Sequence, residues 1–114
     1  MGDPVIVEAV RTPIGKRGGW LAGIIAPNLL SIVQQEVINR AGVPPESVDQ
    51  LVGGCVTQAG QQASNVTRNA WLSADIGYTP AATTVDCQCG SGAQANIFAQ
   101  GLIATGGAEV AIGC

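Results

Sequence analysis

The sequence predicts an α/β fold in which a mostly parallel β-sheet carries helices on both faces. Short apolar or β-branched runs alternate with longer amphipathic segments along the chain, a pattern typical of parallel strands joined by right-handed crossovers. Residues 83–107 have the pattern of a strand, a sharp turn and a helix, and no charged residue occurs from Cys87 to Ala108. We therefore expect a strand, a cysteine-bearing turn and a buried helix at the centre of the fold.

The first half of the chain is expected to hold a strand, a helix and a second strand. Val5–Val10 is almost entirely apolar, which suits a buried central strand. An amphipathic helix begins around Pro27 and ends at Gly42, in agreement with the preference for Pro in the first turn and Gly after the last. The second strand is expected at Leu51–Val56, although its two glycines weaken it.

The second half repeats this alternation. Ser64–Leu72 is expected to form a helix with Ser64 as its N-cap, and the β-branched run Thr83–Asp86 a third strand. The helix that follows covers residues 93–103, and Glu109–Gly113 is the fourth strand. Because a helix without a charged face is usually buried all round, we expect the helix at residues 93–103 to be covered from above and below.

The composition indicates a surface that is largely covered. The chain has 114 residues, enough for one domain, and only 11% are charged, against roughly 25% in ordinary soluble proteins. Few charges are left to cover an isolated small domain. The missing cover is expected to come from a remainder of the polypeptide, from a partner subunit, or from both.

Several classes of function are excluded by charge and pattern. The net charge is −3 and the five basic residues form no patch, which argues against a nucleic-acid surface. No apolar run approaches the ~20 residues of a membrane span, and the first residues show no secretory signal, so a cytoplasmic protein is expected. Cys87 and Cys89 have Cys-x-Cys spacing and the sequence contains no His, which argues against zinc.

Cys89 stands where the third strand passes into the helix. The first N–H groups of a helix lack internal partners and carry partial positive charge, which favours a thiolate at that place. Gly90 and Gly92 remove side chains that would block a substrate. This arrangement resembles a nucleophile elbow with Cys in place of Ser. The alternative is that Cys89 is simply a small buried apolar residue.

Three ordered segments resemble the thiolase family across the whole chain. They are Val85–Gly92 (VDCQCGSG) with Ala108–Ile112 after its helix, Arg11–Gly15 (RTPIG), and Gln58–Gly60 (QAG) followed by Asn65 and Arg68. The Cys-Gln-Cys-Gly-Ser-Gly form is most similar to thiolases that shorten sterol side chains or fatty acyl chains.

The resemblance implies an acyl-CoA acyltransferase that forms or cleaves the carbon–carbon bond of a 3-ketoacyl-CoA. Coenzyme A is then a co-substrate, and no cofactor is held permanently. Cys89 is implied to take up the acyl group and its own N–H to hold the thioester oxygen, while Gly90 and Gly92 leave room for the acyl chain. The segment Gln58–Arg68 is implied to lie near a subunit interface and the pocket entrance of a homo-oligomer, a dimer or a tetramer.

One departure from the family pattern is large. The resemblance calls for a His base and a second catalytic Cys in a second half of similar fold. This sequence has no His, and none of Cys55, Cys87 and Cys114 lies in a match to the second cysteine motif. Residues 1–114 are therefore expected to be a truncated thiolase N-terminal domain, a single domain that has no turnover alone.

Three other interpretations stay open on the sequence. A ketoacyl synthase that uses carrier-protein substrates shares the strand–Cys–helix geometry. A non-catalytic, thiolase-like module that binds lipids or a partner subunit fits the missing His. A plain structural α/β domain with incidental cysteines is the third.

Overall fold

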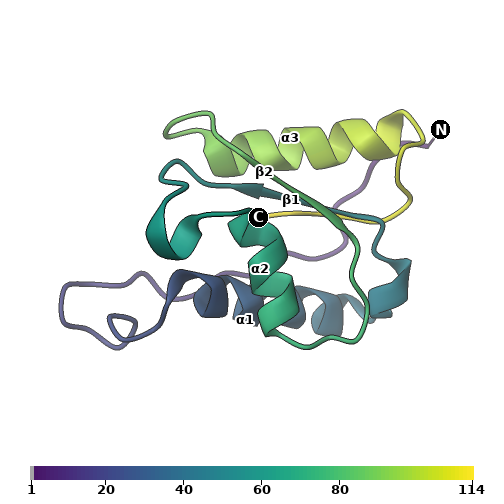
Figure 1. The fold of residues 1–114 in the computed structure, drawn as a ribbon. Coiled ribbons are helices and arrows are strands. Elements are labelled where there is room, and N and C mark those ends of the chain that lie inside the picture. Colours follow the sequence, from purple (N-terminus) through teal and green to yellow (C-terminus); the bar gives the residue numbers. More distant parts are fainter. Residues whose placement is uncertain (1) are drawn as a thin grey trace.

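The computed structural model describes residues 2–114 as a three-layered α/β unit. The elements are α1 (Ala26–Ala41), η1 (Pro45–Ser47), β1 (Gln50–Gly54), η2 (Gly60–Gln62), α2 (Val66–Ser73), β2 (Ala81–Val85), α3 (Ser91–Ala104) and β3 (Ala111–Gly113). The strands are parallel, in the order β2-β1-β3. Helix α3 covers one face of the sheet, and α1 and α2 lie on the other (Figure 1). The predicted fold class is confirmed.

The alternation of side chains along β1 divides the core into two parts. Successive residues of a strand point to opposite faces, so Leu51 packs toward α1 and α2 whereas Val52 packs toward α3. The two buried clusters are Ile38, Val48, Leu51 and Trp71 on the first side, and Val52, Ala95 and Ala99 on the second. The alanines of the second cluster let α3 lie close to the sheet.

The N-cap of helix α2 lies one residue later than predicted. The N-cap is Asn65, with φ 66°, and its side-chain oxygen accepts the N–H of Arg68 at 3.3 Å. Asn65 also donates to the carbonyl of Ala82 at 2.9 Å and accepts from the Thr84 hydroxyl at 2.8 Å. Asn tolerates the left-handed region better than most residues, which suits it to this cap position. Its hydrogen bonds to Ala82 and Thr84 also join α2 to β2. The expectation of a Ser64 cap was wrong.

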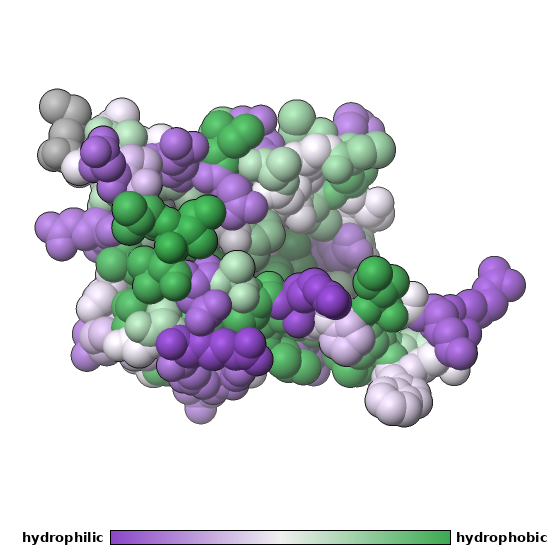
Figure 2. All heavy atoms as spheres, turned by 180° about the vertical axis from the view of Figure 1, so that it is seen from behind, coloured by the Kyte–Doolittle hydropathy of each residue, from purple (hydrophilic) through white to green (hydrophobic). Residues whose placement is uncertain are grey.

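The segment Val5–Val10 is not the central strand that its apolar pattern predicts. Residues 4–10 lie outside the sheet, and Val5, Ile6 and Val7 are 74%, 91% and 70% exposed. Both sides of β1 are already paired, with β2 and with β3, so no central place remains. Residues 3–8 instead line a groove of about 600 Å³ together with parts of α1, α3 and β3. Figure 2 shows the molecule from behind, hollowed between hydrophobic side chains.

Helix α3 is buried on one face only. Ser91, Ala95 and Ala99 face the sheet, whereas Ile97 and Phe98 are 56% and 46% exposed. The expected cover on all sides is therefore absent within residues 2–114. The absence of charged residues on α3 is therefore not accompanied by burial on all sides within residues 2–114. None of the helices in this range is long and apolar enough to cross a membrane.

A carboxylate joins the start of β1 to the approach to β3. The Asp49 side chain accepts the N–H groups of Glu109 at 2.7 Å and Val110 at 3.1 Å. These hydrogen bonds lower the pKa of Asp49 below its ordinary value of 3.8, since they favour the charged form.

We expect Asp49→Asn to reduce the free energy of unfolding at neutral pH and to matter less in acid. A depressed folded-state pKa gives stability that is fully present above the unfolded pKa and is lost as pH falls through the folded pKa. Urea unfolding of both proteins from pH 7 to pH 3 should show the gap between them narrowing below about pH 4. Asp3→Asn, at an exposed site, is the control. A gap that is constant with pH would contradict the assignment.

Candidate active site

The turn between β2 and α3 carries Cys89. β2 ends at Val85 and α3 begins at Ser91, with Gly90 as its N-cap, so Cys89 directly precedes the cap. Its side chain is exposed. The structure thus has the predicted order of strand, cysteine and helix, and it excludes the alternative that Cys89 is a buried packing residue within this chain.

Two successive backbone hydrogen bonds close the turn. Gly90 N–H donates to the carbonyl of Cys87 at 3.0 Å, and Ser91 N–H donates to that of Gln88 at 3.1 Å. Gln88 has φ 49°, in the left-handed region that residues other than Gly adopt infrequently. Across residues 2–114, no acceptor takes the backbone N–H of Cys89. This N–H therefore remains available to a ligand beside the sulfur.

The two glycines differ in what surrounds them. A Cβ atom at Gly92 would meet nothing within 4 Å, so the first turn of α3 faces open space there. A Cβ atom at Gly90 would lie 3.4 Å from the carbonyl oxygen of Cys87, an ordinary contact. Both residues are exposed. The surface beside Cys89 is consequently unobstructed on the Gly92 side.

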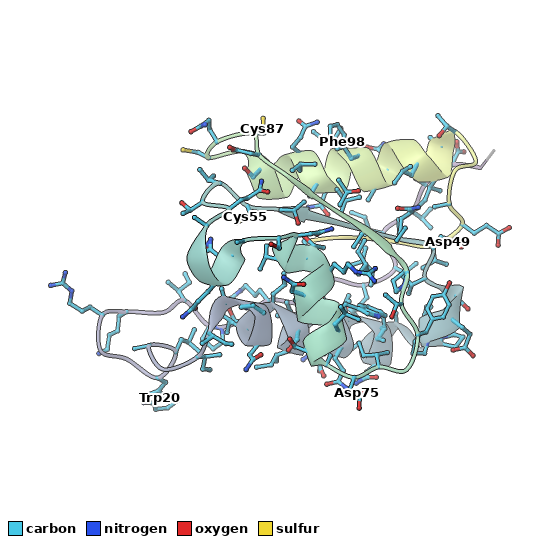
Figure 3. The ribbon with its side chains drawn as sticks, in the orientation of Figure 1. Trp20, Asp49, Cys55, Asp75, Cys87 and Phe98 are labelled. Atoms are coloured by element: carbon cyan, nitrogen blue, oxygen red, sulfur yellow. The ribbon has the colours of Figure 1, made fainter. Side chains whose placement is uncertain are left out.

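A polar loop lies at the same end of the sheet. Cys55 follows β1, and its N–H donates to the carbonyl of Val85, the last residue of β2, at 2.9 Å. The amide of Gln62 donates to the Cys55 sulfur at 3.2 Å. Figure 3 shows Cys55 and Cys87 at this end, with Asp49 at the opposite one. The loop of residues 58–62 therefore borders the edge that carries the Cys87–Cys89 turn.

Cys114, which follows β3, has a different environment. Burial raises the pKa of its thiol, and a hydrogen bond from the Gln34 amide at 3.8 Å opposes that shift. Because the thiolate is the reactive form, Cys114 is expected to react slowly with electrophiles at neutral pH.

Two residues that support the turn were missed by sequence reasoning. The hydroxyl of Ser91 accepts the N–H of Cys87 at 2.9 Å and donates to the carbonyl of Gln88 at 2.6 Å. Gly54, at the end of β1, lies so close to α3 that a Cβ there would be 2.2 Å from the Ser91 carbonyl carbon. A serine at a helix start and a glycine inside a strand were the available signals.

Comparison with known proteins agrees with this arrangement. Over residues 4–114 the chain matches the profile of the thiolase N-terminal domain. The chain belongs to the thiolase family.

Individual relatives cover the chain almost completely. A steroid 3-ketoacyl-CoA thiolase of Mycobacterium tuberculosis is 39% identical over 98% of this chain, and an acetyl-CoA acetyltransferase of Cupriavidus necator is 41% identical over 98%. The crystal structure of a Bacillus anthracis acetyl-CoA acetyltransferase superimposes with a TM-score of 0.85 at 40% identity over 96% of this chain. The chain spans 28% of the length of each of these proteins.

Proposed function

We propose that Cys89 is the acyl-accepting nucleophile of a thiolase-type acyltransferase. The thiolate attacks the carbonyl carbon of an acyl-CoA thioester, a bond forms between that carbon and the Cys89 sulfur, and the bond to the coenzyme A sulfur breaks. Coenzyme A leaves as a thiolate and takes up a proton. The single observation that supports this role is an exposed cysteine in the turn before an apolar helix of a thiolase-family chain.

The surroundings of Cys89 suit this step. Its N–H, which no acceptor in residues 2–114 takes, is proposed to hold the oxygen on which negative charge develops. Donors fixed in advance at such a place are a major source of rate enhancement. Gly90 and Gly92 are proposed to leave room for the acyl group, since the space beside Gly92 is open.

The complete reaction is proposed to be thiolytic cleavage or condensation of a 3-ketoacyl-CoA, with coenzyme A as co-substrate. We propose substrates from fatty-acid or sterol side-chain metabolism, in support of which the relatives include a steroid 3-ketoacyl-CoA thiolase and an acetyl-CoA acetyltransferase. We also propose that the protein acts as a homo-oligomer. Residues 1–114 contain no His, so the general base that this reaction needs has no candidate imidazole in them. We therefore expect slow acylation of this chain without turnover.

The experiment is to incubate the chain with acetyl-CoA, and in parallel with a longer saturated acyl-CoA, and to measure intact mass over time. We expect one acyl group per chain, located by peptide mapping on the peptide that carries Cys89. A carrier-protein thioester should transfer much less acyl group to the chain. Efficient transfer from that donor would instead indicate a ketoacyl synthase. Preferential labelling of Cys55 or Cys87 would overturn the proposal.

A second candidate is a non-catalytic module that binds acyl chains, favoured by the absence of His. It would bind a fluorescent acyl-CoA reversibly and leave the mass of the chain unchanged. The same mass measurement therefore separates the two candidates.

A further inference from the structure

We propose that Ser91 is a positioning residue for Cys89, acting through the peptide unit that joins Gln88 to Cys89. The inference rests on the proposed role of Cys89 as acyl acceptor. Ser91 is the first residue of α3 and is only 4% exposed, so its hydroxyl is directed into the protein and is not a surface group.

The contacts of this hydroxyl lie on both sides of the turn. It accepts the N–H of Cys87 at 2.9 Å and donates to the carbonyl of Gln88 at 2.6 Å. The backbone N–H of Ser91 reaches the same carbonyl at 3.1 Å. The Gln88 carbonyl is thereby fixed by two donors from one residue.

Planarity carries this restraint to Cys89. The carbonyl of Gln88 and the N–H of Cys89 belong to one peptide unit, and none of the peptide bonds described is cis. In a planar trans peptide the C=O and N–H vectors point in opposite directions. A carbonyl held toward Ser91 therefore turns the Cys89 N–H away from α3, where no acceptor in residues 2–114 meets it.

The restraint acts on a residue with an uncommon backbone conformation, and Ser91 itself is in contact with the sheet. Gln88 has φ 49°, a conformation that L residues with side chains adopt infrequently. The Ser91 backbone in turn rests against Gly54 at the end of β1. The contacts thus run from β1 through Ser91 to Gln88 and then to the N–H of Cys89.

The test compares two reactions at the same sulfur in Ser91→Ala. Acylation by acetyl-CoA passes through an oxyanion that needs the Cys89 N–H, whereas alkylation by iodoacetamide does not. We expect the acylation rate of Cys89 to fall about tenfold or more, below the 10²–10³ seen when an oxyanion donor is removed outright. Alkylation of Cys89 should stay within about twofold, because the sulfur remains exposed.

Two further variants separate positioning from a general effect on folding. The hydroxyl of Ser31 resembles that of Ser91, since it is nearly buried and donates to the carbonyl of Asn28, three residues earlier, at 2.7 Å. It does not contact the turn that carries Cys89, so Ser31→Ala should acylate and alkylate at the rates of the parent. Ser91→Thr keeps the hydroxyl and should recover most of the acylation rate. Alkylation of Cys55 and Cys114 in the same samples reports loosening of the fold.

Each outcome has a definite meaning. Equal acylation in the parent and Ser91→Ala, or equal losses in Ser91→Ala and a folded Ser91→Thr, would overturn the positioning role alone. Faster alkylation of all four cysteines in Ser91→Ala would show that Ser91 stabilises the fold in general, and this result would also overturn the positioning role. Failure of the parent to acylate at Cys89 would overturn the proposed function, and this inference with it.

Discussion

Replacing Cys89 by alanine is expected to abolish acyl transfer to the chain while leaving the fold intact. The side chain is exposed in the turn before α3, so its removal takes no apolar atom out of the two core clusters. Substitutions at such surface positions usually change the free energy of unfolding by less than about 0.5 kcal/mol. Intact mass after incubation with acetyl-CoA should show no adduct, and urea unfolding should be unchanged.

Cys87→Ala is the matched control for this prediction. Cys87 is also exposed and lies two residues earlier in the same turn, so it shows whether any exposed cysteine of this turn would take up the acyl group. Its replacement should leave the acyl adduct in place. An adduct that survives in Cys89→Ala and disappears in Cys87→Ala would show that Cys87 is the nucleophile and that our proposal is wrong. The family assignment would still stand.

The two ends of helix α1, which depend on local signals, were predicted well. Helix α1 was expected from Pro27 and Gly42, and it covers Ala26–Ala41 with Gly42 at φ 66° as its C-cap. These signals act within one turn of the helix, so the local sequence is sufficient to recognise them. The apolar segment Val5–Val10 was misread as a central strand, because a strand exists only where another segment pairs with it, and β2 and β3 occupy both sides of β1.

In the candidate site, too, the features set by the local sequence were predicted, and those set by contacts between distant segments were not. The sequence locates Cys89 between a strand and a helix, since both elements lie within a few residues of it. The contact between Gly54 and Ser91 joins residues that are far apart in the chain, and no spacing rule reveals it. The glycines of β1 were expected to weaken the strand, whereas in the structure Gly53 and Gly54 allow close approach by Thr67 and by the start of α3.

The largest expected loss of stability is that of Gly54→Ala. A Cβ at this position would lie 2.2 Å from the carbonyl carbon of Ser91, 2.3 Å from its oxygen and 2.4 Å from the nitrogen of Gly92. These are backbone atoms that cannot rotate away, so α3 has to move from the sheet as a unit. Overpacking typically costs about 1–3 kcal/mol, and we expect a value near 3 kcal/mol in urea unfolding.

The same displacement should reach the candidate site, because Ser91 holds the Gln88 carbonyl by its hydroxyl and its N–H. Acylation of Cys89 is therefore expected to fall in Gly54→Ala even under conditions where the protein remains folded. Gly92→Ala is the matched control for stability alone, because Gly92 is proposed to leave room for the acyl group: it adds a methyl group to α3 that meets nothing within 4 Å. It should be neutral or stabilising by up to about 1 kcal/mol. Equal stability of the two variants would show that α3 does not contact β1 closely at Gly54. The proposed link from the sheet through Ser91 to the turn would then be wrong.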